Sequence, residues 1–124
     1  MPADFADIYN PGYGEHAEIK GSGTEAVITN WVDPRSKLEW MFQTSEPGKY
    51  RVEVLVKANE KAELSLDLNG KMQKAVITPT LDRFDVVRLG EIEIKETGDQ
   101  VITLTPDPEM WNHVELMYLE LIKL

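Results

Sequence analysis

Apolar and polar residues alternate along much of the chain, and this period of two is typical of β-strands with one face on a core. The alternation runs through residues 38–43, resumes through residues 50–56 and returns in residues 64–68. A turn-forming Glu-Pro-Gly-Lys sequence at residues 46–49 separates the first two runs. We therefore expect antiparallel strands, each with one face on the core and the other toward solvent.

The second half of the chain continues this pattern, and its turns are recognisable. Asn69-Gly70 is a strong two-residue hairpin signal, so we expect the return strand to cover residues 71–78. A further strand is expected over residues 84–94, with a bulge at Gly90, and another over residues 101–105.

The last segment, residues 114–124, is apolar on both faces. Strict alternation places Leu116 and Leu119 on opposite sides of a strand. A helix also fits the spacing of the apolar residues. The all-β pattern elsewhere favours a strand that is buried on both faces or contains a bulge.

The N-terminal part has a weaker pattern. Short strands are expected at residues 17–20 and 26–29, whereas residues 1–14 contain a proline and two glycines near their end and are expected to be irregular. The folded domain would then occupy residues 15–124. Eight or nine short strands with frequent turns predict an all-β fold, an antiparallel β-sandwich.

Composition narrows the function classes. The chain has 124 residues, enough for one domain with one core, and a formal net charge of -9. This acidity disfavours nucleic acid and anionic membranes as partners, because both attract basic surfaces. The absence of cysteine excludes disulfides and thiol chemistry. The N-terminus lacks the features of a signal peptide, and we expect the chain to be a piece of a longer protein.

Catalytic templates find no match in the sequence. There is no nucleophile elbow, phosphate loop or zinc-binding HExxH sequence, and the two histidines, His16 and His113, have no local partners of a triad. A pair of carboxylates could serve glycoside hydrolysis, and Asp33, Asp107 and Glu109 lie in expected loops. So small a chain does not build a deep cleft, however, and we expect that it is not an enzyme.

Two tryptophans are the candidates for ligand binding. Trp40 is in phase with the apolar face of its strand and belongs to the core, but Trp31 and Trp111 lie in expected loops. Flat aromatic faces pack on the C–H groups of sugars, while polar neighbours bond the hydroxyls. The polar neighbours are Asp33, Arg35, Asn112 and His113. The alternative is that both tryptophans fold down and plug the end of the sandwich.

Three segments of the chain resemble galactose-binding-like sandwich modules. They read ITNWVDP at residues 28–34, LEWMF at residues 38–42 and PGKYRVEV at residues 47–54. More narrowly, they resemble carbohydrate-binding module families 6 and 35, and the C-terminal accessory domains of bacterial α-L-fucosidases and sulfatases. The resemblance implies a jelly-roll sandwich. Its motifs are mainly structural, so they bear more on the fold than on the ligand.

The resemblance also implies positions for two kinds of site. Members of these families often bind sugar in loops at one end of the sandwich, with an asparagine before the last strand, and Asn112 occupies that position. Where many members carry a tryptophan before the strand that begins near Phe84, this chain has Leu81. Family members often bind a structural calcium, for which Glu18 and Glu120 are the matching acids here.

Two functions are consistent with these observations. The first is a non-catalytic carbohydrate-binding module of a larger glycoside-processing enzyme, which binds an oligo- or polysaccharide. The second is a structural accessory domain that packs on the catalytic domain of the same protein and binds no sugar. In either case we expect a monomeric domain of a bacterial protein that is secreted to the periplasm or the extracellular space.

Overall fold

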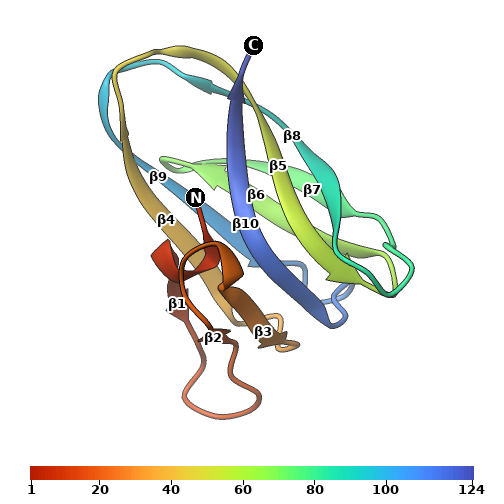
Figure 1. Ribbon diagram of the computed structural model, residues 1–124. Helices are drawn as coiled ribbons and strands as arrows, with labels where there is room; N and C mark the ends of the chain where they lie inside the picture. Colours follow the sequence, from red (N-terminus) through yellow and green to blue (C-terminus); the bar gives the residue numbers. More distant parts are fainter.

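The computed structural model describes residues 1–124, and these form a β-sandwich of two five-stranded antiparallel sheets (Figure 1). One sheet has the strand order β1-β4-β9-β6-β7 and the other β2-β3-β10-β5-β8. The elements in chain order are the 3-10 turn η1 (Ala3–Phe5), β1 (Asp7–Tyr9), β2 (Glu18–Lys20), the 3-10 turn η2 (Gly23–Glu25), β3 (Val27–Trp31), β4 (Lys37–Thr44), β5 (Gly48–Ala58), β6 (Ala62–Leu68), β7 (Lys71–Ile77), β8 (Asp85–Ile94), β9 (Gly98–Pro106) and β10 (Val114–Lys123). The sandwich predicted from the sequence is confirmed, with ten strands in place of eight or nine.

The expected turns and bulge lie where the sequence places them. Asn69 and Gly70 have φ angles of 52° and 95°, so both are left-handed, as a tight two-residue hairpin requires. On β8, Gly90 pairs with Val52 whereas Arg88 pairs with Glu53, so one extra residue lies between them. This bulge lets Val87, Leu89, Ile92 and Ile94 all face the core.

A second bulge determines which face of β10 is buried. Leu116 pairs with Val56 and Tyr118 pairs with Leu55, which leaves Met117 without a partner. The extra residue reverses the alternation, so Leu116 and Leu119 are both fully buried. The expectation that they lie on opposite faces is therefore wrong, and the bulged strand is the alternative that the structure adopts.

The N-terminal segment is part of the sandwich. Ala3 and Ala6 are buried, and residues 7–9 pair with residues 37–39 as an edge strand. The indole of Trp40 donates a hydrogen bond to the carbonyl of Pro2 at 3.2 Å. The prediction of an irregular segment before residue 15 is therefore wrong for residues 2–9, because alanines at two positions fit against the core and the edge of β4 was free to pair.

Because the strands run antiparallel, every second connection lies at the same end of the sandwich. Five connections share one end: residues 10–17, 32–36, 59–61, 78–84 and 107–113. We call this the loop end, and it is the lower end of the molecule in Figure 1. All the residues predicted to contact sugar lie at or next to it. The chain has no helix long and apolar enough to cross a membrane.

Candidate functional site

Trp31 and Trp111 form one buried contact at the loop end, which we call the tryptophan wedge. Trp31 is the last residue of β3 and has no exposed surface. Its indole donates to the carbonyl of Ser36 at 2.8 Å. The half-buried ring of Trp111 lies 4.5 Å from that of Trp31, tilted by 58°, and donates to the carbonyl of Trp31 at 3.1 Å. The expectation that Trp31 offers a free face to a sugar is wrong, and Trp111 keeps only part of its surface exposed.

A local irregularity in β3 explains the burial of Trp31. Ile28 pairs with Leu116 and Trp31 with Val114, so three steps along β3 match two steps along β10. The extra residue lies near Asn30, whose φ of 56° is left-handed, a conformation that asparagine tolerates better than most residues. Strict alternation places Ile28 and Trp31 on opposite faces. The bulge places both on the core.

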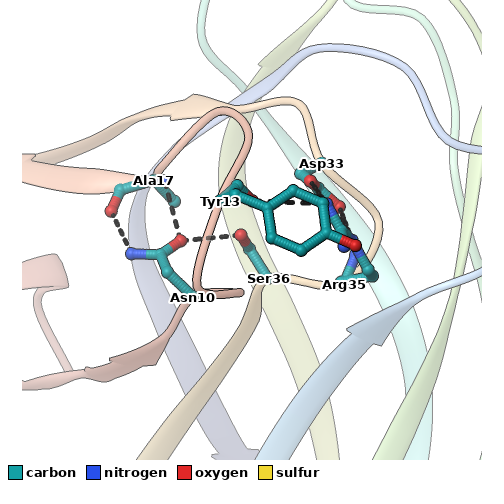
Figure 2. A network of polar contacts seen from close by, with 6 residues as sticks. All are labelled: Asn10, Tyr13, Ala17, Asp33, Arg35 and Ser36. Atoms are coloured by element: carbon teal, nitrogen blue, oxygen red, sulfur yellow. Dashed lines mark hydrogen bonds and ion pairs between the residues drawn. The ribbon is translucent and has the colours of Figure 1, made fainter.

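Asp33 and Arg35 form a rigid ion pair in the loop after β3 (Figure 2). The guanidinium donates from Nε to Oδ1 of Asp33 at 3.0 Å and from Nη2 to Oδ2 at 2.7 Å. The backbone N–H of Arg35 also donates to Oδ1 at 2.9 Å. Such a bidentate contact fixes the plane of the guanidinium, not only its position.

Tyr13 lies against this ion pair, and its ring is mostly exposed. The guanidinium carbon of Arg35 is 4.7 Å from the centre of the Tyr13 ring, and Nη2 donates to the carbonyl of Tyr13 at 3.3 Å. Tyr13 is nevertheless 75% exposed. In Figure 2 the ring lies flat over the end of Arg35 and faces away from the sheets. We call these three residues the tyrosine platform.

The loop that carries Tyr13 is closed by a clasp of hydrogen bonds. Asn10 donates to the carbonyl of Ala17 and accepts from its N–H, both at 2.9 Å. The buried hydroxyl of Ser36 donates to the same amide oxygen of Asn10 at 2.6 Å. Gly14 has a φ of 96°, and a Cβ atom there would lie 2.9 Å from Oδ2 of Asp33. The loop can therefore approach the ion pair only because residue 14 has no side chain.

The ion pair shifts the titration of both partners. Hydrogen bonds from the side chain and backbone of Arg35 lower the pKa of Asp33 to about 2, and those of Asp33 raise the pKa of Arg35 above its usual value. Asp33 is therefore ionised across the physiological range. The opposite charges cancel, so the platform carries no net charge.

Asn112 and His113 line a different feature, a polar hollow of about 470 Å³ at the loop end. The other lining residues are Lys57, Asn59, Glu60, Asp82 and Glu115. Asn112 donates to the carbonyl of Lys61 at 3.1 Å. Lys57 and Glu115 form an ion pair at 3.8 Å. No phenylalanine, tyrosine or tryptophan lines this hollow, so it offers hydrogen-bonding groups without a flat apolar floor.

Leu81 is next to the hollow and is 82% exposed. Leu81 and Asp82 have φ angles of 56° and 61°, an unfavourable conformation for two consecutive residues with side chains. Asp82 lines the hollow, and Leu81 is the apolar residue beside it in the chain. The position that the resemblance assigns to an aromatic residue is thus exposed here, but it carries an aliphatic side chain.

The two acids expected to bind calcium do not converge. Glu18 pairs across the sheet with Thr29 and lies 3.8 Å from the amine of Lys20. Glu120 pairs with Glu53, which lies three residues along β5 from Val56, the partner of Leu116, and this corresponds to roughly 10 Å along the sheet. No group of three or more acidic or histidine side chains is placed to hold a metal ion. Calcium needs six to eight oxygen ligands, so this pair does not fit the ion.

The predicted sugar-contacting residues therefore fall into three groups. Asp33 and Arg35 belong to the platform, Trp31 and Trp111 to the wedge, and Asn112 and His113 to the hollow. Tyr13 was not predicted. The sequence feature that could have indicated it is Pro-Gly-Tyr-Gly, which is typical of a surface loop and has an aromatic residue between two glycines. Because residues 1–14 are expected to be irregular, the sequence assigns Tyr13 no position at the loop end.

The fold matches those of carbohydrate-binding modules. It superposes on a family 35 carbohydrate-binding module from Clostridium thermocellum with a TM-score of 0.78 and 15% identity, covering 99% of this chain and 95% of the module. The module CsCBM6-3 from Clostridium stercorarium, solved in complex with cellobiose, gives a TM-score of 0.70 and 13% identity, with 100% and 92% covered. The resemblance inferred from the sequence is therefore confirmed at the level of the fold.

Larger proteins contain the same fold. The cycloalternan-forming enzyme from Listeria monocytogenes, in complex with a pentasaccharide substrate, matches with a TM-score of 0.80 and 16% identity. That match covers 98% of this chain, which spans only 12% of the length of the enzyme. No curated protein matches the sequence. The family described as Domain of unknown function (DUF5077) matches residues 11–109, most of the chain, and the protein therefore belongs to this family.

Proposed function

We propose that this domain is a non-catalytic carbohydrate-binding module of a larger glycoside-processing protein. The observation that carries the proposal is the polar hollow at the loop end, where Asn112 and His113 are joined by acidic and basic side chains. The fold supports it, because two separately solved carbohydrate-binding modules match the chain over nearly their whole length.

The hollow has the chemistry that recognition of sugar hydroxyls requires. Carboxylates such as Asp82 and Glu60 accept hydrogen bonds, Lys57 donates them, and the amide of an asparagine does both. A sugar hydroxyl also both donates and accepts, so a mixed set of this kind suits it better than a surface of one charge. Leu81 is exposed and precedes Asp82, a lining residue of the hollow, so we expect it to supply an apolar contact to the ligand. Without an aromatic floor the affinity would be modest, and tethering to a catalytic domain would raise the effective concentration of the ligand.

The chemistry of the hollow favours binding over catalysis. Glu60 and Asp82 are exposed, and Glu115 is in an ion pair with Lys57. A general acid in a glycosidase needs an environment that raises its pKa, which burial in an apolar pocket provides. The hollow has no hydrophobic lining residue. This surface therefore lacks the environment that would turn a carboxylate into a proton donor at neutral pH.

Isothermal titration with a panel of neutral oligosaccharides, beginning with cellobiose and cellohexaose, tests the proposal. We expect saturable binding of at least one neutral glycan at micromolar to millimolar concentration. The variants Asn112→Ala and His113→Ala should weaken it by about tenfold or more, which is about 1.4 kcal/mol. A matched control is Lys95→Ala, because Lys95 lines a polar hollow of similar size, about 480 Å³, at the opposite end of the sandwich. A folded sample that binds no member of the panel would refute the proposal.

A second candidate function is a structural accessory domain that packs on a catalytic domain. It is favoured by an apolar row across the outer face of the sheet that contains β10. Tyr118 pairs with Leu55, and Leu55 pairs with Val86, which is 48% exposed. Apolar side chains aligned across three strands on a solvent face are typical of surfaces that another domain covers.

The variant Val86→Asp in the parent protein separates the two candidates. If another domain covers this surface, the substitution should lower the melting temperature of the parent protein and leave that of the isolated domain unchanged. Val76→Asp is the matched control, because Val76 is 37% exposed on the outer face of the other sheet. An unchanged melting temperature of the parent protein would count against the accessory role and would not affect the carbohydrate-binding role.

A further inference from the structure

We infer that the tyrosine platform is a second carbohydrate-contacting surface, so that the loop end binds an elongated, uncharged oligosaccharide across the platform and the polar hollow. The inference rests on the proposed function and extends it from a single hollow to a longer ligand. Its observations are the exposure of Tyr13, the rigidity of the groups beneath it and the order of the three features along the sheet.

Tyr13 has an exposed ring that contributes little to the fold. One face rests on the guanidinium of Arg35, yet 75% of the residue is exposed. The ring is absent from the hydrophobic core and from the residues packed against it. An aromatic residue in this state retains a flat apolar face with a polar edge, the shape that packs on the C–H groups of a sugar ring.

The platform is held in place before any ligand arrives. Both carboxylate oxygens of Asp33 fix the guanidinium, and the Asn10 clasp closes the loop that carries the tyrosine. Ordering a flexible side chain on binding costs free energy, and a ring that is already supported avoids much of that cost.

The charge of the platform identifies the class of ligand. The positive charge of Arg35 is offset by Asp33, and the chain has a net charge of -9. An acidic sugar on the platform would therefore meet repulsion, because the cation of the platform is already paired with Asp33. Nε and Nη2 of Arg35 bond within the protein, which leaves Nη1 as a donor for a sugar hydroxyl. These features favour a neutral glycan.

The sheet order places the platform and the hollow on opposite sides of the tryptophan wedge. Within the sheet β2-β3-β10-β5-β8, the platform lies in the loops that adjoin β2 and β3. The hollow is lined from β10, β5 and the loop before β8. Trp31 and Trp111 join β3 to the loop before β10. With strands about 4.8 Å apart, the two surfaces are separated by roughly 10–20 Å. A single sugar ring does not span that distance, whereas an oligosaccharide does.

The test compares short and long neutral glucans on the full chain. Cellobiose and cellohexaose, and isomaltose and isomaltohexaose, are titrated calorimetrically into the native protein and into Tyr13→Ala. Hexagalacturonic acid is titrated into the native protein as the acidic comparison. We expect the hexasaccharide of the recognised series to bind about tenfold more tightly than its disaccharide. Tyr13→Ala should remove that difference and leave disaccharide binding unchanged, whereas Tyr13→Phe should retain it. Tyr9→Ala is the matched control, because Tyr9 is a tyrosine that is 47% exposed on β1.

The possible outcomes separate this inference from the proposed function. If the native protein binds and Tyr13→Ala binds the hexasaccharide with the same affinity, the platform does not contact the ligand and the hollow alone is the site. Equal loss for disaccharide and hexasaccharide also refutes it, because it makes the tyrosine part of a single site. Tighter binding of hexagalacturonic acid than of the neutral hexasaccharides overturns the choice of ligand class. No binding of these glucans by the folded chain refutes the inference, and no binding of any neutral oligosaccharide of the wider panel refutes the proposed function on which it rests.

Discussion

The tryptophan wedge and the tyrosine platform lie at the same end of the sandwich, yet the wedge buries its aromatic rings and the platform exposes its ring. In the wedge, a bulge at Asn30 brings Trp31 into the core, and Trp111 packs on it. On the platform, Tyr13 lies on an ion pair that is itself partly exposed. The comparison shows that backbone irregularity and the nature of the supporting group decide whether a loop aromatic is exposed. The size of the ring does not.

The two regions should therefore contribute to different properties of the protein. The wedge removes a large apolar area from water and satisfies two carbonyl groups through indole N–H donors, so it contributes mainly to stability. The platform removes little apolar area, and its ion pair is partly exposed on the side of Arg35, so its contribution to stability is small. Substitutions in one region should change the free energy of unfolding, and substitutions in the other should change glycan affinity.

The largest effect is expected from Trp31→Ala. The substitution removes a fully buried indole and its hydrogen bond to Ser36, and it leaves Trp111 without its packing partner. Replacement of a buried tryptophan by alanine costs about 3–5 kcal/mol. We expect a loss of that size in the free energy of unfolding, measured by urea denaturation.

Trp31→Phe is the control for this prediction. Phenylalanine keeps most of the packing but cannot donate to the Ser36 carbonyl, and a buried acceptor left without a partner costs about 1–3 kcal/mol. The loss should therefore be smaller than that of Trp31→Ala. If Trp31→Ala changes stability by less than 1 kcal/mol, the wedge is not a structural unit and the comparison fails.

The sequence predicts the sandwich well because most strands follow simple alternation. The runs that became β4, β5 and β6 need only a period of two, and Asn69-Gly70 needs only the turn preference of its residues. It predicts side-chain positions poorly where that period is broken, which occurs at two places that matter here. The bulge at Asn30 places the side chain of Trp31 on the core face of the sheet, and the bulge at Met117 does the same for Leu119.

The remaining errors have a different physical cause. The N-terminal strand is three residues long and depends on the free edge of β4, which no local pattern reveals. The contact between Tyr13 and Arg35 joins residues 22 positions apart. Asp33 and Arg35 lie in the loop between β3 and β4, where the sequence predicts a loop. Their strong bond to each other, however, is a property of the loop conformation and not of the residue types.

A smaller effect is expected from Gly14→Ala, which alters the platform without touching the wedge. The new Cβ would lie 2.9 Å from Oδ2 of Asp33 and 3.1 Å from Nη2 of Arg35, at a φ that side chains rarely adopt. We expect a loss of about 1–2 kcal/mol in stability, from the left-handed backbone alone, and a loss of hexasaccharide affinity similar to that of Tyr13→Ala. Urea denaturation and calorimetry measure the two effects.

Gly12→Ala is the matched control in the same loop, because no atom lies within 4 Å of its expected Cβ. This variant should keep both native stability and native affinity. If Gly14→Ala binds the hexasaccharide as the native protein does, the close approach of the loop to the ion pair has no role in presenting Tyr13.

The smallest effect concerns acid and the ion pair of the platform. The pKa of Asp33 is lowered to about 2 by the hydrogen bonds from Arg35. A group with a lower pKa in the folded state stabilises the protein above its unfolded pKa, near 3.8, and loses that effect as the pH falls toward 2. The difference in melting temperature between native protein and Asp33→Asn should therefore be constant from pH 8 to about pH 5 and shrink below pH 4. Asp99→Asn is the control, because it removes an exposed carboxylate whose partner is the neutral amide of Gln43 and not a cation. A difference that is unchanged down to pH 2 would show that the carboxylate charge contributes nothing to holding Arg35. The platform would then rest on the Asn10 clasp and Gly14 alone.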